Sequence, residues 1–366
     1  MSFGMKLVRK MFFFLVVFIA AGLASHRPPA EKILTFYGAS DASAAVALGR
    51  EMFIVADDEH NILRVYKTNQ TSQPVFSCDL TQFLDVDAEH PEADIEGATT
   101  LGDYIYWITS HGRNRDGKNR PSRYRFFATK IAIENDNLTI TPVGIPCKSL
   151  VHELVKDETM HKLDLGKATG FGAVNLTKRQ RKKLAPKQQG LNIEALCAST
   201  DAKTIYIGFR NPRPNSKALV VPLSNPQQVI ERAEPPVFAA PILWDFKGLG
   251  IRAMEYSDFH KAYFIIAGPH DDRPGFALYR WSGKIDSQPT FVRKIHLDKF
   301  NFTPEALVVF RNLPKFLLLS DDGTLPIDIS GDSECMPDRL RQDGRCPNKY
   351  LTDPDKKTFR ALWLTP

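Results

Sequence analysis

Three glutamates, Glu96, Glu194 and Glu305, stand at the same place in three similar segments, DIEGA (94–98), NIEAL (192–196) and TPEAL (303–307). The matching position is Ser43 in DASAA (41–45) and Arg252 in GIRAM (250–254). Three carboxylates held close together need a cation, an arginine partner or a shared proton. We regard the glutamates as candidate catalytic groups and Arg252 as their partner or an anion ligand. The alternative is a structural network in which the glutamates cap backbone amides.

Further carboxylates occur in short polar loops and at the start of one of these segments. They are Asp57, Asp58, Asp94, Asp321 and Asp322. Several carboxylate oxygens at different angles suit Ca²⁺, and the sequence has no EF-hand loop. We therefore predict that any calcium site is assembled from distant segments.

Two loops combine arginine with histidine or asparagine. His111 and Arg113 lie in SHGRNRDGKNR (110–120), and Arg210 and Asn211 lie in RNPR (210–213). A histidine there could transfer a proton while the arginines and Asn211 bind an anionic group. The nucleophile-elbow, P-loop and Rossmann glycine patterns do not occur.

The strands that would position these residues can be recognised from an internal repeat. The five segments start 53, 98, 58 and 53 residues apart, and each precedes a turn and a β-forming run. These runs are residues 52–56, 104–109, 204–209, 262–267 and 315–320. Short strands recurring every 50-odd residues indicate an all-β protein with the blades of a β-propeller. The alternative is a β-sandwich. In a propeller, the candidate residues would converge on one face of the central shaft.

The two ends of the chain predict how the ring closes. Residues 32–37 form an orphan strand, and the last repeat has a late third strand, 359–364. The N-terminal strand can complete the last blade and protect its edge. We predict five blades, with a degenerate sixth as the alternative. The long second interval predicts a basic helical insertion at about 147–190.

The first 24 residues are typical of a signal peptide. Lys6, Arg9 and Lys10 precede the apolar run 11–24, which is too short to span a bilayer. Their removal would lower the formal net charge from +6 to about +3, so we expect no nucleic-acid partner. We expect residues 25–366 to form one exported, monomeric domain without a membrane anchor. Cys335 and Cys346 are the best disulfide pair.

Several stretches together resemble an exported bacterial family of unknown function, the one numbered 3616. They include EADIEGATTLGDYIYWITSHGRNRDGK (92–118), IYIGFRNP (205–212) and GLGIRAMEY (248–256). The resemblance implies a propeller-like fold and export, and it carries no activity. The acidic ring is more distantly similar to secreted phytase and esterase-like propellers, which would imply calcium and phosphate esters.

Three functions follow from these residues. The first is metal-assisted hydrolysis of an anionic ester such as a phosphoester, with Ca²⁺ as the cofactor. The second is a non-catalytic propeller that binds a small anion, a glycan or a protein. The third is glycoside cleavage by two of the glutamates.

Overall fold

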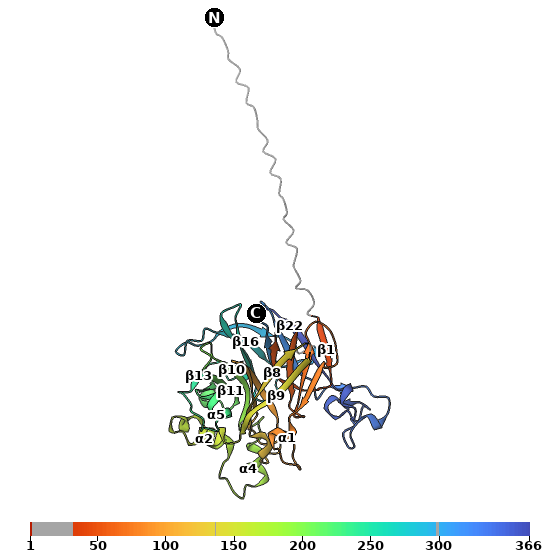
Figure 1. The fold of residues 1–366 in the computed structure, drawn as a ribbon, viewed down its shortest axis with the longest axis horizontal. Helices are drawn as coiled ribbons and strands as arrows, with labels where there is room; N and C mark the ends of the chain where they lie inside the picture. Colours follow the sequence, from red (N-terminus) through yellow and green to blue (C-terminus); the bar gives the residue numbers. More distant parts are fainter. Residues whose placement is uncertain (2–31, 136, 298–299) are drawn as a thin grey trace. The chain divides into compact units, whose positions relative to one another are not determined.

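The computed structural model describes residue 1 and residues 32–135, 137–297 and 300–366 (Figure 1). The predicted signal peptide lies, apart from Met1, outside the described residues. In the described part of the chain, no helix is long and apolar enough to cross a membrane.

Five four-stranded antiparallel sheets make up the domain 32–366. Each of the first four is built from consecutive strands, and the fifth combines strands from both ends of the domain. The sheets are β2 (Ala42–Leu48), β3 (Met52–Asp57), β4 (Ile62–Lys67) and β5 (Phe76–Asp79); β6 (Ile95–Leu101), β7 (Tyr104–Thr109), β8 (Phe126–Glu134) and β9 (Asn137–Cys147); β10 (Asn192–Ala198), β11 (Ile205–Asn211), β12 (Ala218–Leu223) and β13 (Ile242–Trp244); β14 (Gly250–Ser257), β15 (Ala262–Gly268), β16 (Phe276–Trp281) and β17 (Thr290–Ile295); and β18 (Thr303–Val309), β19 (Phe316–Asp321), β22 (Thr358–Leu364) and β1 (Ile33–Tyr37).

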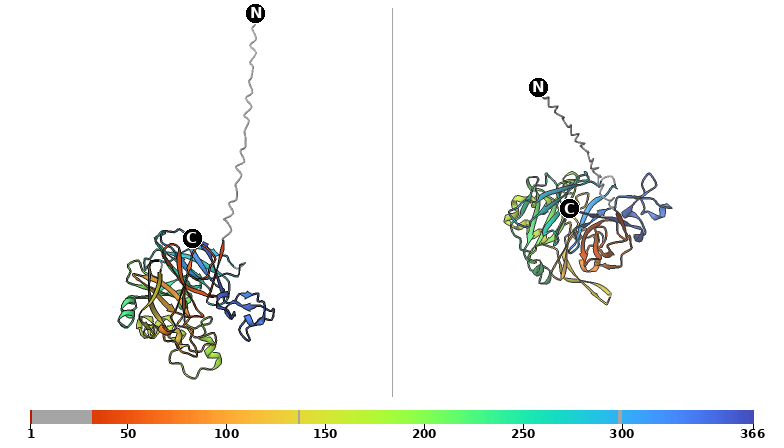
Figure 2. Two further views of the ribbon diagram at one scale, coloured as in Figure 1. Left: turned by 45° about the vertical axis from the view of Figure 1, so that its right-hand side comes forward. Right: turned by 90° about the horizontal axis from the view of Figure 1, so that it is seen from above.

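The sheets follow one another in chain order around a central axis, as the right-hand view of Figure 2 shows. The inner strands β2, β6, β10, β14 and β18 contact one another in sequence, and β18 returns to contact β2. The fold is therefore a β-propeller with five blades, as the repeat predicts.

The N-terminal strand closes the last blade. β1 pairs antiparallel with β22, with Leu34 opposite Ala361 and Phe36 opposite Phe359. The two phenylalanine rings stack with their centroids 5.2 Å apart. This confirms the expected closure. The last blade obtains its fourth strand from the N-terminal part of the domain, so β22 is paired on both sides.

Small residues after the candidate position allow the inner strands to approach closely. A Cβ added at Gly97 would lie 3.0 Å from the backbone of Ala195 and Leu196 on the next inner strand. Larger side chains pack between the blades, where Trp244, Trp281 and Tyr263 are buried in one cluster. The small-residue pattern of the repeat is thus explained by crowding at the axis.

Two long connections are attached to the same end of the ring. The connection from β9 to β10 carries α2 (Leu150–Lys156), a 3₁₀ turn at Glu158–Leu163, α3 (Leu165–Thr169) and α4 (Lys178–Lys183). This confirms the helical insertion. The connection from β19 to β22 holds β20 (Pro326–Ile327), β21 (Cys346–Pro347) and the expected disulfide between Cys335 and Cys346. Shorter helices are α1 (Thr81–Leu84) and α5 (Pro226–Glu231).

Candidate functional site

A β-bulge occurs at the same place in all five inner strands. In each strand the pairing with the second strand of the blade skips one residue. The skipped residues are Ser43, Glu96, Glu194, Arg252 and Glu305. Bulges re-aim side chains next to functional sites. The position singled out in the sequence is therefore a repeated structural device that presents a side chain to the axis.

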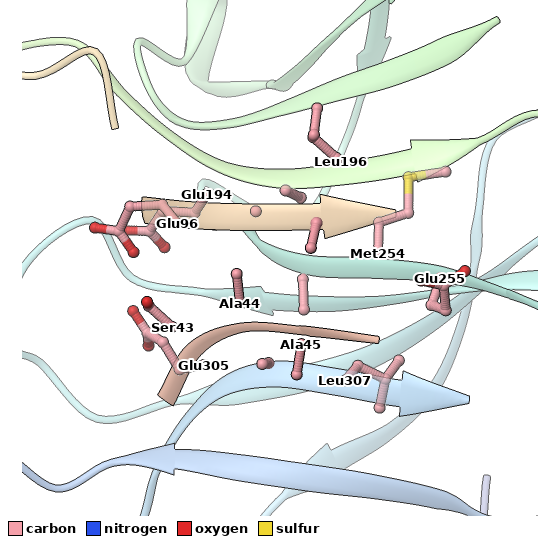
Figure 3. A pocket seen from close by; sticks show the side chains of 15 residues that line it. Ser43, Ala44, Ala45, Glu96, Glu194, Leu196, Met254, Glu255, Glu305 and Leu307 are labelled. Atoms are coloured by element: carbon pink, nitrogen blue, oxygen red, sulfur yellow. The ribbon is translucent and has the colours of Figure 1, made fainter. Parts of the chain in front are cut away.

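The inner strands enclose a narrow channel along the axis (Figure 3). Glu96, Glu194, Glu305 and Ser43 lie at one end, and Glu255 lies toward the other, with alanines between them. The cavity has a volume of about 20 Å³, which is room for about one water molecule. An organic substrate therefore cannot enter the channel and would have to bind outside its acidic end, which we call the mouth.

One half of the mouth is compensated by arginines. Arg252 Nε lies 3.0 Å from Glu194 Oε2, and the same guanidinium pairs with Glu305. Arg210 Nη1 lies 2.6 Å from Glu194 Oε1, which also accepts a 2.7 Å hydrogen bond from Asn192 Nδ2. All of these side chains are buried. Burial outweighs the attraction of Arg252 and raises the pKa of Glu305 to about 7.

The other half of the mouth has fewer partners. Glu96 is 8% exposed, and among the described residues its carboxylate has no hydrogen bond or ion pair. Burial, followed by the charges of Asp94, Glu194 and Glu305, raises the pKa of Glu96 well above its usual value. Asp58 Oδ1 is also buried without a hydrogen-bond partner, and burial together with Glu59 and Glu96 raises the pKa of Asp58. Asp94 pairs with Arg123 at 2.8 Å.

A third group of acids lies next to Asp58. Asp41 accepts a 2.9 Å hydrogen bond from the Gly323 amide, and its carboxyl shares a hydrogen bond with Asp321. Burial and the charges of Asp58 and Asp321 raise the pKa of Asp41. A Cβ on Gly323 would overlap the Asp41 carboxylate, so any larger residue there would displace that carboxylate. Glu59 pairs with Lys349 from the disulfide-containing connection.

Three groups of carboxylates bring one oxygen each within 4.8 Å of one another. They are Asp41, Asp58 and Glu59; Asp58, Asp94 and Glu96; and Glu96, Glu194 and Glu305. Arg252 and Arg210 neutralise two members of the last group, and Lys349 pairs with one member of the first. In the described part of the chain the middle group has one ion pair, Asp94 with Arg123, while Arg252 and Lys349 act on Glu96 and Asp58 without pairing with them. The middle group is therefore the best candidate for a cation.

Asp57 and Asp322, which the sequence suggested as metal ligands, are each engaged in contacts within the protein. Asp57 accepts hydrogen bonds from the backbone amides of Ser40 and Glu59, so its carboxylate shapes the loop. Asp322 is held by Arg360 through both oxygens and by Ser320 at 2.7 Å. Both carboxylates thus accept hydrogen bonds within the protein, and neither belongs to a carboxylate group close enough to share an ion among the described residues.

His111 and Arg113 are not at the mouth either. His111 is 1% exposed, with Nδ1 2.9 Å from the Thr109 carbonyl and its ring against Tyr124, which contacts Phe171 of the insertion. Burial lowers the pKa of His111 to about 4. Arg113 donates hydrogen bonds to the carbonyls of Thr169, Gly170 and Gly117. His111 thus packs beneath the insertion, and Arg113 anchors the insertion through hydrogen bonds. Neither side chain contacts the glutamates.

The remaining loop residues are also occupied. Asn211 Nδ2 donates hydrogen bonds to the carbonyls of Pro186 and Gln188, at the end of the insertion. Arg210 and Arg252 lie at the mouth, where Arg210 is ion-paired with Glu194 and Arg252 with Glu194 and Glu305. The expected clamp of free arginines on an anion is therefore absent among these residues.

Two cations of the mouth were not found from the sequence, Arg123 and Lys349. Both come from long connections outside the repeat, and no pattern in those segments marks them. Glu59 and Asp41 belong to segments that the repeat does identify, at the first inner strand and the loop after the second.

The molecule is thus a five-bladed β-propeller with a carboxylate and arginine cluster at one end of its channel. The chain belongs to the protein family of unknown function DUF3616, whose model matches residues 41–304. No curated protein matches the sequence.

Solved structures with similar folds are remote in sequence. Glutaminyl cyclase of Myxococcus xanthus is 9% identical, with 78% of this chain and 88% of that chain covered and a TM-score of 0.42. The Cps50 (Swd1) β-propeller domain of Myceliophteria thermophila is 8% identical, with 91% and 100% covered and a TM-score of 0.37. Hydrazine synthase of Kuenenia stuttgartiensis is 8% identical, with 81% and 60% covered and a TM-score of 0.35.

Proposed function

We propose that the mouth binds one divalent cation of the calcium type on Asp58, Asp94 and Glu96. We further propose that the bound cation supports hydrolysis of an anionic ester. The observation that carries this proposal is the carboxylate of Glu96. It is nine-tenths buried, lies at the acidic end of the channel and lacks a hydrogen bond or ion pair among the described residues. A buried carboxylate without a partner is costly unless a cation or a proton compensates it.

The neighbours of Glu96 favour a cation. Asp58 contributes a second oxygen without a hydrogen bond, and Asp94 contributes a third carboxylate within 4.8 Å. Calcium accepts six to eight oxygen ligands, so waters or a substrate would complete its coordination. Because the channel beyond holds about one water, those open positions would face outward from the mouth.

Such a cation would polarise an ester oxygen and lower the pKa of a bound water. The chain's own residues would then place the proton. Glu305, with a pKa raised to about 7, lies within 4.8 Å of Glu96 and is suited to accept the proton from water and return it to the leaving alcohol. His111 has no part in this step.

A non-catalytic role is the second candidate, and one observation favours it. Arg210, Arg252 and Arg113 are all engaged in contacts within the protein. Without free arginines, an anionic ligand would depend on the cation itself. The second candidate function is therefore the binding of a small anion through the metal without turnover, and experiments must distinguish it from hydrolysis.

Export remains part of the proposal. The N-terminal residue pattern supports it, as does the Cys335–Cys346 disulfide, because disulfides persist in oxidising compartments. Secretion of the full-length chain from a bacterial host, with N-terminal sequencing of the product, would test it. Retention of the intact N-terminus in the cytoplasm would contradict it.

The cation is tested by calorimetric titration with CaCl₂ and by thermal unfolding with CaCl₂ or EGTA. The wild type is expected to bind one equivalent and to be stabilised. Asp58→Asn and Glu96→Gln should lose both effects, whereas Asp286→Asn, an exposed carboxylate outside the mouth, should keep them. Equal behaviour of all four proteins would overturn the proposal.

Hydrolysis is tested with p-nitrophenyl phosphate, p-nitrophenyl butyrate and a p-nitrophenyl glycoside. We expect calcium-dependent turnover of the phosphate ester, reduced about 100-fold in Glu305→Gln. Asp286→Asn serves again as the control. Calcium binding without turnover of any ester would leave the non-catalytic role, and glycoside turnover would indicate cleavage by the glutamates.

A further inference from the structure

The connection between β19 and β22 forms a small unit that is cross-linked by a disulfide. The Cys335–Cys346 disulfide and Leu351 are buried together, with Ile327 and Tyr350 packed against them. β20 and β21 pair within the same unit. Because a disulfide restricts the conformations of the loop that it closes, the residues just after Cys346 are held in a defined path.

Asn348 fixes that path to the propeller. It is fully buried, donates hydrogen bonds to the carbonyls of Asp322 and Thr358, and accepts a 3.0 Å hydrogen bond from the Thr358 amide. The next residue, Lys349, donates its backbone amide to the Gly323 carbonyl at 3.0 Å. The backbone of Lys349 is thereby anchored beside the loop in which Gly323 contacts Asp41.

The side chain of Lys349 enters the outer part of the mouth. Its ammonium pairs with Glu59, and both side chains are about three-quarters buried. Although burial acts in the opposite direction, Glu59, Asp41 and Asp58 raise the pKa of Lys349. These three carboxylates are the ones whose oxygens lie within 4.8 Å of one another.

We infer that Lys349 is a tethered cation that occupies the outer of two adjoining carboxylate sites. The outer site is Asp41, Asp58 and Glu59, and the inner site is the one proposed above for calcium, Asp58, Asp94 and Glu96. Asp58 belongs to both sites. The ammonium therefore limits the mouth to one metal ion and weakens its binding through repulsion across Asp58. This inference deepens the proposed function and rests on the same mouth.

The test compares CaCl₂ titrations of wild type, Lys349→Met and Lys349→Arg by calorimetry at pH 7.5. Lys349→Met retains the length of the side chain and removes the charge. We expect it to bind a second equivalent of Ca²⁺ or to bind the first about tenfold more tightly. Lys349→Arg keeps the charge and should behave like the wild type. A gain of binding cannot come from a protein that fails to fold.

The outcomes separate this inference from the proposed function. One equivalent at unchanged affinity in both wild type and Lys349→Met would overturn the inference and leave the calcium site standing. Binding by Lys349→Met alone would overturn the proposed calcium site of the wild type and support the inference. No binding by any of the three proteins would overturn both.

The tether is tested by a second variant, Cys335→Ser with Cys346→Ser. Loosening the unit should release Lys349 part of the time and shift calcium affinity in the same direction as Lys349→Met, by a smaller factor. Unchanged affinity in this variant, together with a gain in Lys349→Met, would show that Asn348 alone places the lysine and would overturn the role of the disulfide.

Discussion

The two halves of the mouth use the same backbone device with different partners. Glu194 and Glu305 stand at bulges in β10 and β18 and share Arg252, which stands at the bulge of the intervening strand β14. Glu96 stands at the bulge of β6, between Ser43 at the bulge of β2 and Glu194 at the bulge of β10. The serine hydroxyl hydrogen-bonds the Ala56 and Ile95 carbonyls and supplies no charge.

The difference teaches that position in the ring does not decide the role of a carboxylate. Glu194, which pairs with two arginines, is part of the framework, whereas Glu96, which lies near Asp58 and Asp94 without an ion pair, is left to bind something else. Mutations of Glu194 and Arg252 in the first half should therefore act through stability, mutations of Glu305 through turnover, and mutations in the second half through cation binding.

The largest effect on stability is expected when the first half of the mouth loses Arg252. Arg252→Met leaves Glu194 and Glu305 with less compensation in a buried site, which costs about 3–5 kcal/mol when a buried ion pair is broken. Urea unfolding in EGTA measures this loss. Arg280→Met, an exposed arginine on the outer part of the same blade, should change stability by no more than about 0.5 kcal/mol.

Opposite signs are expected for two glutamine substitutions. Glu194→Gln removes the partner of both Arg210 and Arg252 and should destabilise the protein, whereas Glu96→Gln removes an unpaired buried charge and should stabilise it in EGTA by about 1 kcal/mol. Thermal unfolding at pH 8 compares them. The same sign for both variants would show that the two halves are equivalent, contrary to our interpretation.

The ring of bulged residues could be predicted because it is repeated. Each blade places Ser43, Glu96, Glu194, Arg252 or Glu305 at one phase of a pattern that crowding at the axis imposes. The closing strand β1 was predictable for a similar reason, since an unpaired strand at one end matches a missing strand at the other.

The contacts of the loop residues could not be predicted from the sequence. His111 has a left-handed φ of 51° and packs under Tyr124, and Arg113 binds carbonyls 56 and 57 residues away in the insertion. Lys349 enters from a connection without any repeat. These contacts depend on how long loops fold over the ring, and residue type alone does not encode their partners.

Calcium stabilisation of the second half should depend on pH. The pKa values of Asp58 and Glu96 are raised in the folded protein, so the stability of the metal-free protein falls as pH rises from about 4 toward those values. Calcium binds the deprotonated carboxylates. The difference in melting temperature between CaCl₂ and EGTA should therefore grow from pH 5 to pH 8. Differential scanning fluorimetry measures it, and Asp58→Asn with Glu96→Gln should abolish it.

The smallest effect is expected at Glu255, at the far end of the channel. There the effect of burial on a carboxyl pKa can be measured without repulsion from neighbouring carboxylates. Burial raises the pKa of Glu255 to about 8, and the Tyr256 amide, which donates a hydrogen bond to it, acts in the opposite direction. No other carboxylate contributes to this shift, unlike that of Glu96. A raised pKa means that this group costs stability as pH rises from about 4.3 to 8. Glu255→Gln should therefore raise the melting temperature at pH 8.5 by roughly 2 °C and leave it unchanged at pH 4. Calcium binding should be unaffected. If Glu255→Gln abolished calcium binding, the cation would be coupled to the whole channel and the distinction between the two halves of the mouth would fail.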